Sequence, residues 1–176
     1  MITEQGKILE ALKIAIDMES EGKECYQQAS QGSGNEVGRK LLQSLALEEE
    51  VHRRKFIEIY SAIQKRRGWP VTDFQPDKGK RLRALFARTC QAIGVNVKAL
   101  PAELDVITAA IDKEKKSFDL YNHQSQKATY DAERDFYEAL AAEEREHELV
   151  LLDYYEYLAD PADFFTKTEH HSLDGG

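Results

Sequence analysis

LALEEEVH, residues 45–52, and its near-copy LAAEEREH, residues 140–147, decide the fold of this chain. The two stretches lie 95 residues apart, and the same offset pairs Glu19 with Glu114. A repeat that matches apolar positions and unusual polar positions together indicates equivalent structural units. We therefore predict that the chain is built from two matching halves.

Apolar residues in both halves recur every three or four positions, the period of an amphipathic α-helix that buries one face. Breaks in this pattern coincide with residues that end helices, at 31–34, at Gly68-Trp69-Pro70 and at Asp160-Pro161. The pattern predicts four long helices at about residues 4–30, 36–67, 101–127 and 131–158.

The lengths of the connections predict how these helices are arranged. Short breaks join the first two helices into one antiparallel hairpin and the last two into another, whereas a crossover at about residues 68–100 separates the hairpins. A helix of about 30 residues is about 45 Å long, so this crossover can return along the bundle, with a short helix near residues 80–93. We predict an all-α four-helix bundle over residues 1–160, with its second and third helices parallel, and an irregular tail over 161–176.

The charge balance argues against a nucleic-acid partner, because the net charge is −8 and phosphate contacts need clustered Lys and Arg. Short clusters of Lys and Arg occur at 65–67 and 78–88, and we interpret them as solvated faces and ends of helices. No apolar run approaches the roughly 20 residues of a membrane span, and the opening residues MITE do not begin a signal peptide. Cys25 and Cys90 form no CxxC motif, so we expect reduced thiols and a cytoplasmic location.

Six polar residues interrupt the apolar faces of the four predicted helices. One glutamate stands in the apolar stripe of the first helix and one in that of the third. The second and fourth helices each carry a glutamate and, three residues later on the same face, a histidine. Each glutamate falls near the middle of its helix, so an antiparallel bundle brings all six groups to one level. They are Glu19, Glu49, His52, Glu114, Glu144 and His147.

Four ionised carboxylates in an apolar interior would be strongly unfavourable without a counter-charge. Two divalent cations would balance them, with each neutral imidazole completing the coordination of one metal. Carboxylate and imidazole ligands favour iron, with manganese or zinc also possible. We therefore predict a cofactor of two iron ions, a pair suited to reaction with oxygen species.

Position along the helices suggests a role for each residue of the site. Glu49 and Glu144, each beside a histidine, are expected to bridge the metals, and Glu19 and Glu114 to bind them terminally. These four glutamates are the predicted catalytic residues. Two tyrosines, two turns beyond the terminal glutamates, are expected to donate hydrogen bonds to the cofactor site, although packing in the core explains them equally well. They are Tyr26 and Tyr121.

The motifs Glu19, Glu49-Glu50-Val51-His52, Glu114 and Glu144-Arg145-Glu146-His147 resemble the E, ExxH, E, ExxH pattern of the rubrerythrin branch of ferritin-like proteins. The resemblance covers roughly residues 4–158. It implies a ferritin-like bundle whose di-iron site reduces hydrogen peroxide, and relatives in this branch act as oxidases or ferroxidases.

This chain departs from the family pattern in two places. Ser117 stands where rubrerythrins have an additional glutamate. The redox-linked ligand exchange of the family, which uses that glutamate, is therefore not expected to carry over to this chain. The paired CxxC motifs of a rubredoxin domain are not in this sequence. We therefore expect an external electron donor, either a rubredoxin-like protein or a small reductant.

Three functions fit these observations. The first is a di-iron oxidoreductase that consumes hydrogen peroxide or O2, and the second is a ferroxidase or iron-handling protein for which Fe(II) is the substrate. The third is a non-catalytic bundle in which metal stabilises the fold. A homodimer is expected, because a long crossover allows two chains to exchange hairpins.

Overall fold

The computed structural model describes residues 3–65 and 67–173. Arg66, which belongs to the predicted basic cluster and second helix, lies outside these residues, as do residues 1–2 and the end of the predicted tail at 174–176. Within the described ranges the regular structure is entirely helical, without a strand.

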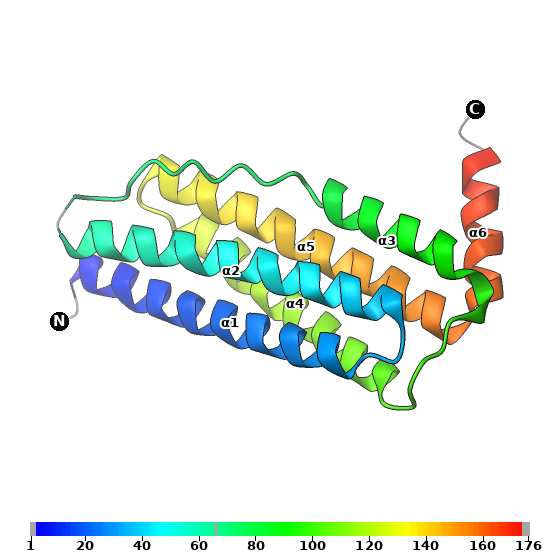
Figure 1. The fold of residues 1–176 in the computed structure, drawn as a ribbon. Helices are drawn as coiled ribbons and strands as arrows, with labels where there is room; N and C mark the ends of the chain where they lie inside the picture. The colour runs from blue at the N-terminus through cyan, green and yellow to red at the C-terminus, as the bar shows by residue number, and fades with distance from the viewer. Residues whose placement is uncertain (1–2, 66, 174–176) are drawn as a thin grey trace.

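Four long helices form the bundle. Helices α1 (Glu4–Gly32) and α2 (Glu36–Gln64) make the first antiparallel hairpin, and α4 (Glu103–Lys127) and α5 (Asp131–Ala159) make the second. Figure 1 shows that α2 and α4 run in the same direction, because the connection between the hairpins travels the length of the bundle. The all-α ferritin-like fold predicted from the sequence is confirmed.

Side-chain caps account for where several helices begin. The Thr3 hydroxyl accepts a hydrogen bond from the Gly6 backbone N–H at 3.1 Å, and the Asn35 side chain accepts one from Gly38 at 2.8 Å. Such caps satisfy backbone N–H groups that have no partner within the helix.

Two of the predicted helix limits were wrong by a few residues. Helix α2 ends at Gln64 rather than at residue 67, where the backbone N–H of Lys65 closes the last turn on Ser61. Helix α4 begins at Glu103 rather than at Pro101, because the Glu103 carboxylate accepts the Leu100 backbone N–H and holds the preceding residues in a turn.

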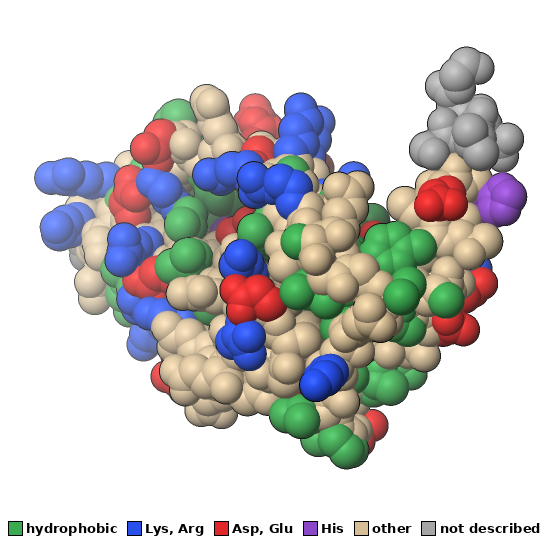
Figure 2. Space-filling model, turned by 45° about the vertical axis from the view of Figure 1, so that its right-hand side comes forward, with side chains coloured by type: hydrophobic (Ala, Val, Ile, Leu, Met, Phe, Trp, Pro, Cys, Tyr) green, Lys and Arg blue, Asp and Glu red, His purple; other side chains and the backbone are tan. Residues whose placement is uncertain are grey.

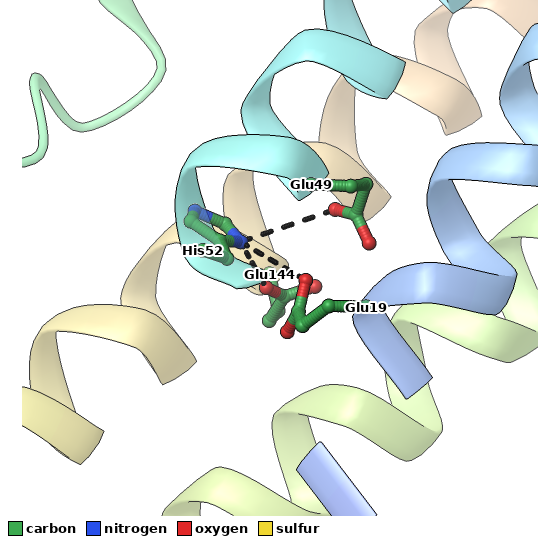
Figure 3. A group of neighbouring side chains, drawn as sticks. All are labelled: Glu19, Glu49, His52 and Glu144. Carbon is green, nitrogen blue, oxygen red and sulfur yellow. Dashed lines mark ion pairs between the residues drawn. The ribbon is translucent and has the colours of Figure 1, made fainter. Parts of the chain in front are cut away.

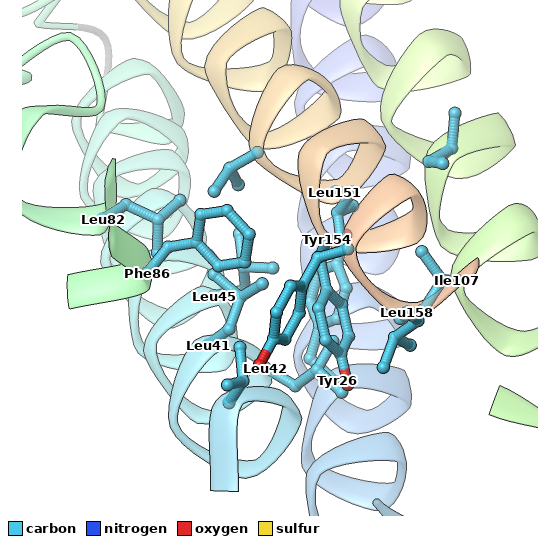
Figure 4. Packing of buried hydrophobic residues seen from close by; sticks show 14 of the residues in the cluster. Tyr26, Leu41, Leu42, Leu45, Leu82, Phe86, Ile107, Leu151, Tyr154 and Leu158 are labelled. Carbon is cyan, nitrogen blue, oxygen red and sulfur yellow. The ribbon is translucent and has the colours of Figure 1, made fainter. Parts of the chain in front are cut away.

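The core consists of two apolar clusters, one toward each end of the bundle. The long helices of both hairpins contribute to both clusters. Figure 4 shows part of the first cluster, where Leu41 and Leu45 of α2 lie near Tyr154 of α5. The second cluster includes Leu12, Phe56, Ile59, Tyr121, Phe136 and Leu140.

The crossover covers the face formed by α2 and α5. Trp69 and Phe74, in its extended first part, place their rings 6.1 Å and 5.5 Å from the ring of Phe136. Its second part is helix α3 (Lys80–Ile93), which confirms the predicted short helix, followed by the 3-10 turn η1 (Gly94–Asn96). Helix α3 buries Leu82 and Phe86 in the first cluster, as Figure 4 shows.

The prediction of an irregular tail was wrong, because residues Pro161–Leu173 form helix α6. The Asp160 carboxylate accepts a hydrogen bond from the Asp163 backbone N–H at 3.0 Å, and a proline suits the first position of a helix. Phe164 and Phe165 place their rings 5.5 Å and 5.9 Å from that of Tyr157. The Asp-Pro pair therefore ends α5 and starts α6, whereas the sequence pattern predicted only the end of the fourth long helix.

The surface is charged and mixed in sign. On the face in Figure 2, Lys and Arg side chains are interspersed with Asp and Glu side chains. None of the helices in the described part of the chain is long and apolar enough to cross a membrane.

Asp160→Ala should loosen α6 without affecting the bundle, because it removes the side-chain cap at a cost of about 1 kcal/mol. Amide hydrogen exchange in peptides from α6 should become faster, whereas exchange in α2 and α5 should not change. Asp160→Asn is the matched control, because asparagine caps a helix equally well. Equal exchange in α6 of the two variants would contradict this account of the helix start.

Candidate metal centre

The structure brings the six predicted polar residues together in one layer across the middle of the bundle. Each long helix contributes at least one of them, and each side chain is at most 3% exposed. The apolar clusters lie above and below this layer, so water is excluded from both sides. The residues are Glu19 of α1, Glu49 and His52 of α2, Glu114 of α4, and Glu144 and His147 of α5.

The six side chains form two overlapping groups, each of which could hold a metal ion. Within each group the nearest donor atoms all lie within 4.8 Å of one another. Glu49 and Glu144 belong to both groups, and Figure 3 shows the first group, in which these carboxylates and Glu19 lie around the ring of His52. The first group is completed by Glu19 and His52, and the second by Glu114 and His147.

The histidines show the two-fold relation between the groups. His52 Nδ1 lies 3.1 Å from an oxygen of Glu144 and 3.4 Å from one of Glu19. His147 Nδ1 lies 3.3 Å from Glu49 and 3.6 Å from Glu114, which are the repeat counterparts of those two glutamates. The imidazole rings are stacked, with centroids 5.6 Å apart and planes 13° from parallel.

Among the described residues, the donor atoms that face the middle of the layer have no hydrogen-bond partner. They include both histidine Nδ1 atoms and at least one oxygen from each of the four glutamates. Buried polar atoms are normally paired, and leaving one unpaired costs about 1–3 kcal/mol. A set of buried, unpaired oxygen and nitrogen donors converging on one space fits divalent metal ions.

Burial and mutual repulsion shift the proton affinities of the carboxylates. Burial, and then the charges of Glu19 and Glu114, raise the pKa of Glu49 to about 8. Burial also raises the pKa of Glu144 well above its usual range, helped by the charge of Glu49. Glu114 shows the opposite result: burial works to raise its pKa, but interactions led by His147 outweigh burial and lower it to about 2.

The histidines retain protons in the metal-free protein. Burial works to lower the pKa of His52, but the carboxylates of Glu144 and Glu19 outweigh burial and raise it well above the usual value. His147 behaves in the same way, with Glu114, Glu48 and Glu49 as its partners. A bound cation would replace these protons, because a metal ligand must be deprotonated.

The two predicted tyrosines lie beside the centre and donate hydrogen bonds across the bundle. Tyr26 of α1 donates to Glu114 of α4, and Tyr121 of α4 donates to Glu19 of α1. Burial and then nearby carboxylate charges raise the pKa of both hydroxyls, so both remain protonated donors. Each tyrosine of one hairpin therefore contacts a buried glutamate of the other hairpin.

Sequence reasoning missed Glu48. Its carboxylate lies 2.8 Å from Nε2 of His147, on the side of the ring opposite the centre. A carboxylate at this position fixes the orientation and tautomer of a metal-binding histidine. The repeat pairs Glu48 with Glu143, which is buried in the structure. This pairing in the sequence could have indicated a role for both glutamates beside the histidines.

Comparison with known proteins identifies the first half of the chain. The family model described as Rubrerythrin matches residues 10–97, which contain Glu19, Glu49 and His52. The second hairpin, with Glu114, Glu144 and His147, lies outside the match and is related to the first by the internal repeat. Neither the curated proteins nor the solved structures gave a match.

The metal-free protein should lose stability as pH rises from 6 to 8. Glu49, with a folded pKa near 8 instead of 4.5, and both histidines hold protons in this range that the unfolded chain releases. The free energy of unfolding should therefore fall by up to about 1.4 kcal/mol per pH unit for each retained proton. Glu49→Gln should reduce this slope in urea titrations at pH 6, 7 and 8.

Glu24→Gln is the control for that experiment, because Glu24 is exposed on α1. Its slope should match that of the unmodified protein. A free energy of unfolding that does not change with pH, or an unchanged slope in Glu49→Gln, would contradict the assignment of these protons.

Proposed function

Because the chain belongs to the rubrerythrin family, we propose that it is a di-iron oxidoreductase that reduces hydrogen peroxide or O2 with electrons from an external donor. The observation that carries the proposal is the pair of four-residue groups that share Glu49 and Glu144. Two overlapping groups of carboxylate and imidazole donors suit two neighbouring metal ions rather than one. Oxygen and nitrogen donors favour iron, with manganese or zinc also acceptable.

The geometry suggests a role for each donor. Glu49 and Glu144 would bridge the two ions, because each belongs to both groups. Glu19 and His52 would complete one ion, and the remaining two residues, Glu114 and His147, would complete the other. With two divalent ions the four carboxylates are neutralised, which removes the main cost of burying them.

The bound iron pair would supply the two electrons that convert hydrogen peroxide and two protons into two molecules of water. The protein would prepare the site for this reaction. Tyr26 and Tyr121 keep their protons and orient the terminal glutamates through their hydroxyl groups. Glu48 holds the ring of His147, and the apolar clusters on both sides exclude water.

An iron-oxidising function is the second candidate, and one observation favours it. Glu48, Glu143 and the outer side of His147 form a third group of possible ligands next to the centre. Glu48 and Glu143 also line a cavity of about 220 Å³ beneath the crossover, together with Asp73 and Asp77. Lys55 and Arg81 also line the cavity and pair with Asp73 and Asp77, so Glu48 and Glu143 are the carboxylates that would attract Fe(II) as a substrate.

Glu144→Gln should lower the metal content to one ion or fewer per chain, because Glu144 contributes to both groups. The helical circular dichroism should stay the same, since the substitution keeps the shape and removes a buried charge. Glu138→Gln, on the exposed face of α5, should keep two ions. Metal analysis after anaerobic reconstitution with Fe(II) is the measurement, and full occupancy in Glu144→Gln would defeat the bridging role.

Rapid mixing of the reduced, iron-loaded protein with hydrogen peroxide and, separately, with O2 tests the reaction itself. Oxidation by peroxide that is at least about tenfold faster supports a peroxidase, a difference of about 1.4 kcal/mol in activation free energy. Repeated turnover of added Fe(II), with retention of the oxidised iron, would favour the iron-oxidising function instead. A reduced protein that reacts with neither oxidant would leave only a metal-binding bundle.

A further inference from the structure

Lys113 of α4, next to the proposed ligand Glu114, carries an ammonium group that the proposed function does not use. The side chain is partly exposed, but its Nζ atom is buried and has no hydrogen-bond partner within residues 3–65 and 67–173. Burying an ammonium group without a partner is unfavourable, because the group loses its hydration. The position therefore calls for a negatively charged partner.

Gly22 of α1 makes room for this ammonium. A methyl group at Gly22 would lie 2.5 Å from Lys113 Nζ and 2.4 Å from an oxygen of Glu49, closer than non-bonded atoms approach. The ammonium and the carboxylate therefore converge on the space that any other residue at this position would fill. Lys113 thus points to the same shared carboxylate that both groups of the candidate centre use.

A groove that is open to the surface reaches Lys113. It lies between α1 and α4, which run beside each other in Figure 1, and encloses about 440 Å³. Its walls are largely apolar and include Ala29, Val106 and Ile107. Lys113 and the buried Tyr26, whose hydroxyl binds Glu114, also line the groove. A small molecule in the groove would therefore meet the ammonium beside the candidate centre.

Metal binding would change the electrostatic surroundings of Lys113. Without metal, a carboxyl oxygen of Glu49 shares the space beside the ammonium. Two divalent cations bound to the four carboxylates would take up this oxygen, and the positive charge of Lys113 would then lack a partner. Because the walls of the groove are largely apolar, this charge would attract an anion more strongly than a fully solvated lysine does.

We propose that the inner end of this groove is a binding site for a small anion, such as hydroperoxide, held by the Lys113 ammonium beside the metal-loaded centre. This inference rests on the proposed function, because it needs bound metal ions to occupy the Glu49 carboxylate that faces Lys113. It names hydroperoxide, the deprotonated form of hydrogen peroxide, as the species that the ammonium would favour, and the groove between α1 and α4 as its route.

Azide is a suitable probe, because it is a small anion that is not consumed. Azide titrated into the oxidised, iron-loaded protein should change its visible absorption spectrum, and calorimetry should detect no binding to the metal-free protein. Lys113→Met should weaken azide binding at least about tenfold while keeping two iron ions per chain, since one charge interaction of this size contributes about 1.4 kcal/mol. Lys116→Met, exposed on the same helix, should bind azide as the unmodified protein does.

The outcomes separate this inference from the function on which it rests. Unchanged azide affinity in a fully loaded Lys113→Met protein would overturn the anion site and leave the di-iron proposal standing. Equal azide binding with and without metal, or no azide binding to the loaded protein, would also overturn it. Failure of the unmodified protein to bind two metal ions would overturn both proposals.

Discussion

The burial of four carboxylates in one layer is the constraint on which the rest of the structure depends. Glu19, Glu49, Glu114 and Glu144 are almost completely inaccessible to water, and their inner oxygens have no hydrogen-bond partner in the described part of the chain. Ionised groups in such a place require compensation by protons or by cations. The raised pKa values of Glu49 and the histidines correspond to compensation by protons. The overlapping donor groups could instead hold cations.

This layer also joins the two hairpins. The helices pack much more extensively within each hairpin than α1 packs against α4 or α2 against α5. Reciprocal hydrogen bonds from Tyr26 and Tyr121 cross the gap at the centre. At one end of the bundle, Glu103 of α4 accepts hydrogen bonds from the Ser33 hydroxyl at 2.6 Å and the Gly34 N–H at 2.9 Å. Loose packing between α1 and α4 leaves the groove that reaches Lys113.

Features that follow from spacing along the chain could be predicted from the sequence, whereas contacts between residues far apart in the chain could not. The helices could be predicted because helical periodicity is visible within each segment of the sequence. The six-residue layer could be predicted because the repeat marks equivalent positions in the two hairpins. Helix α6 was missed because Asp160-Pro161 is typical of both a helix end and a helix start. The contact of its Phe164 and Phe165 with Tyr157 is what holds this helix against the bundle. Glu48 was missed because its partner, His147, is 99 residues away.

By itself, the sequence determined the all-α hairpin repeat and the six residues that interrupt its apolar faces, because side-chain direction in a helix follows directly from spacing. Only the tertiary structure decided how those residues combine. It divided them into groups that share Glu49 and Glu144, and it paired each tyrosine with the opposite hairpin. It also placed Lys113 against Gly22 and Glu49. These contacts depend on the relative position of two hairpins, which a pattern within either hairpin does not contain.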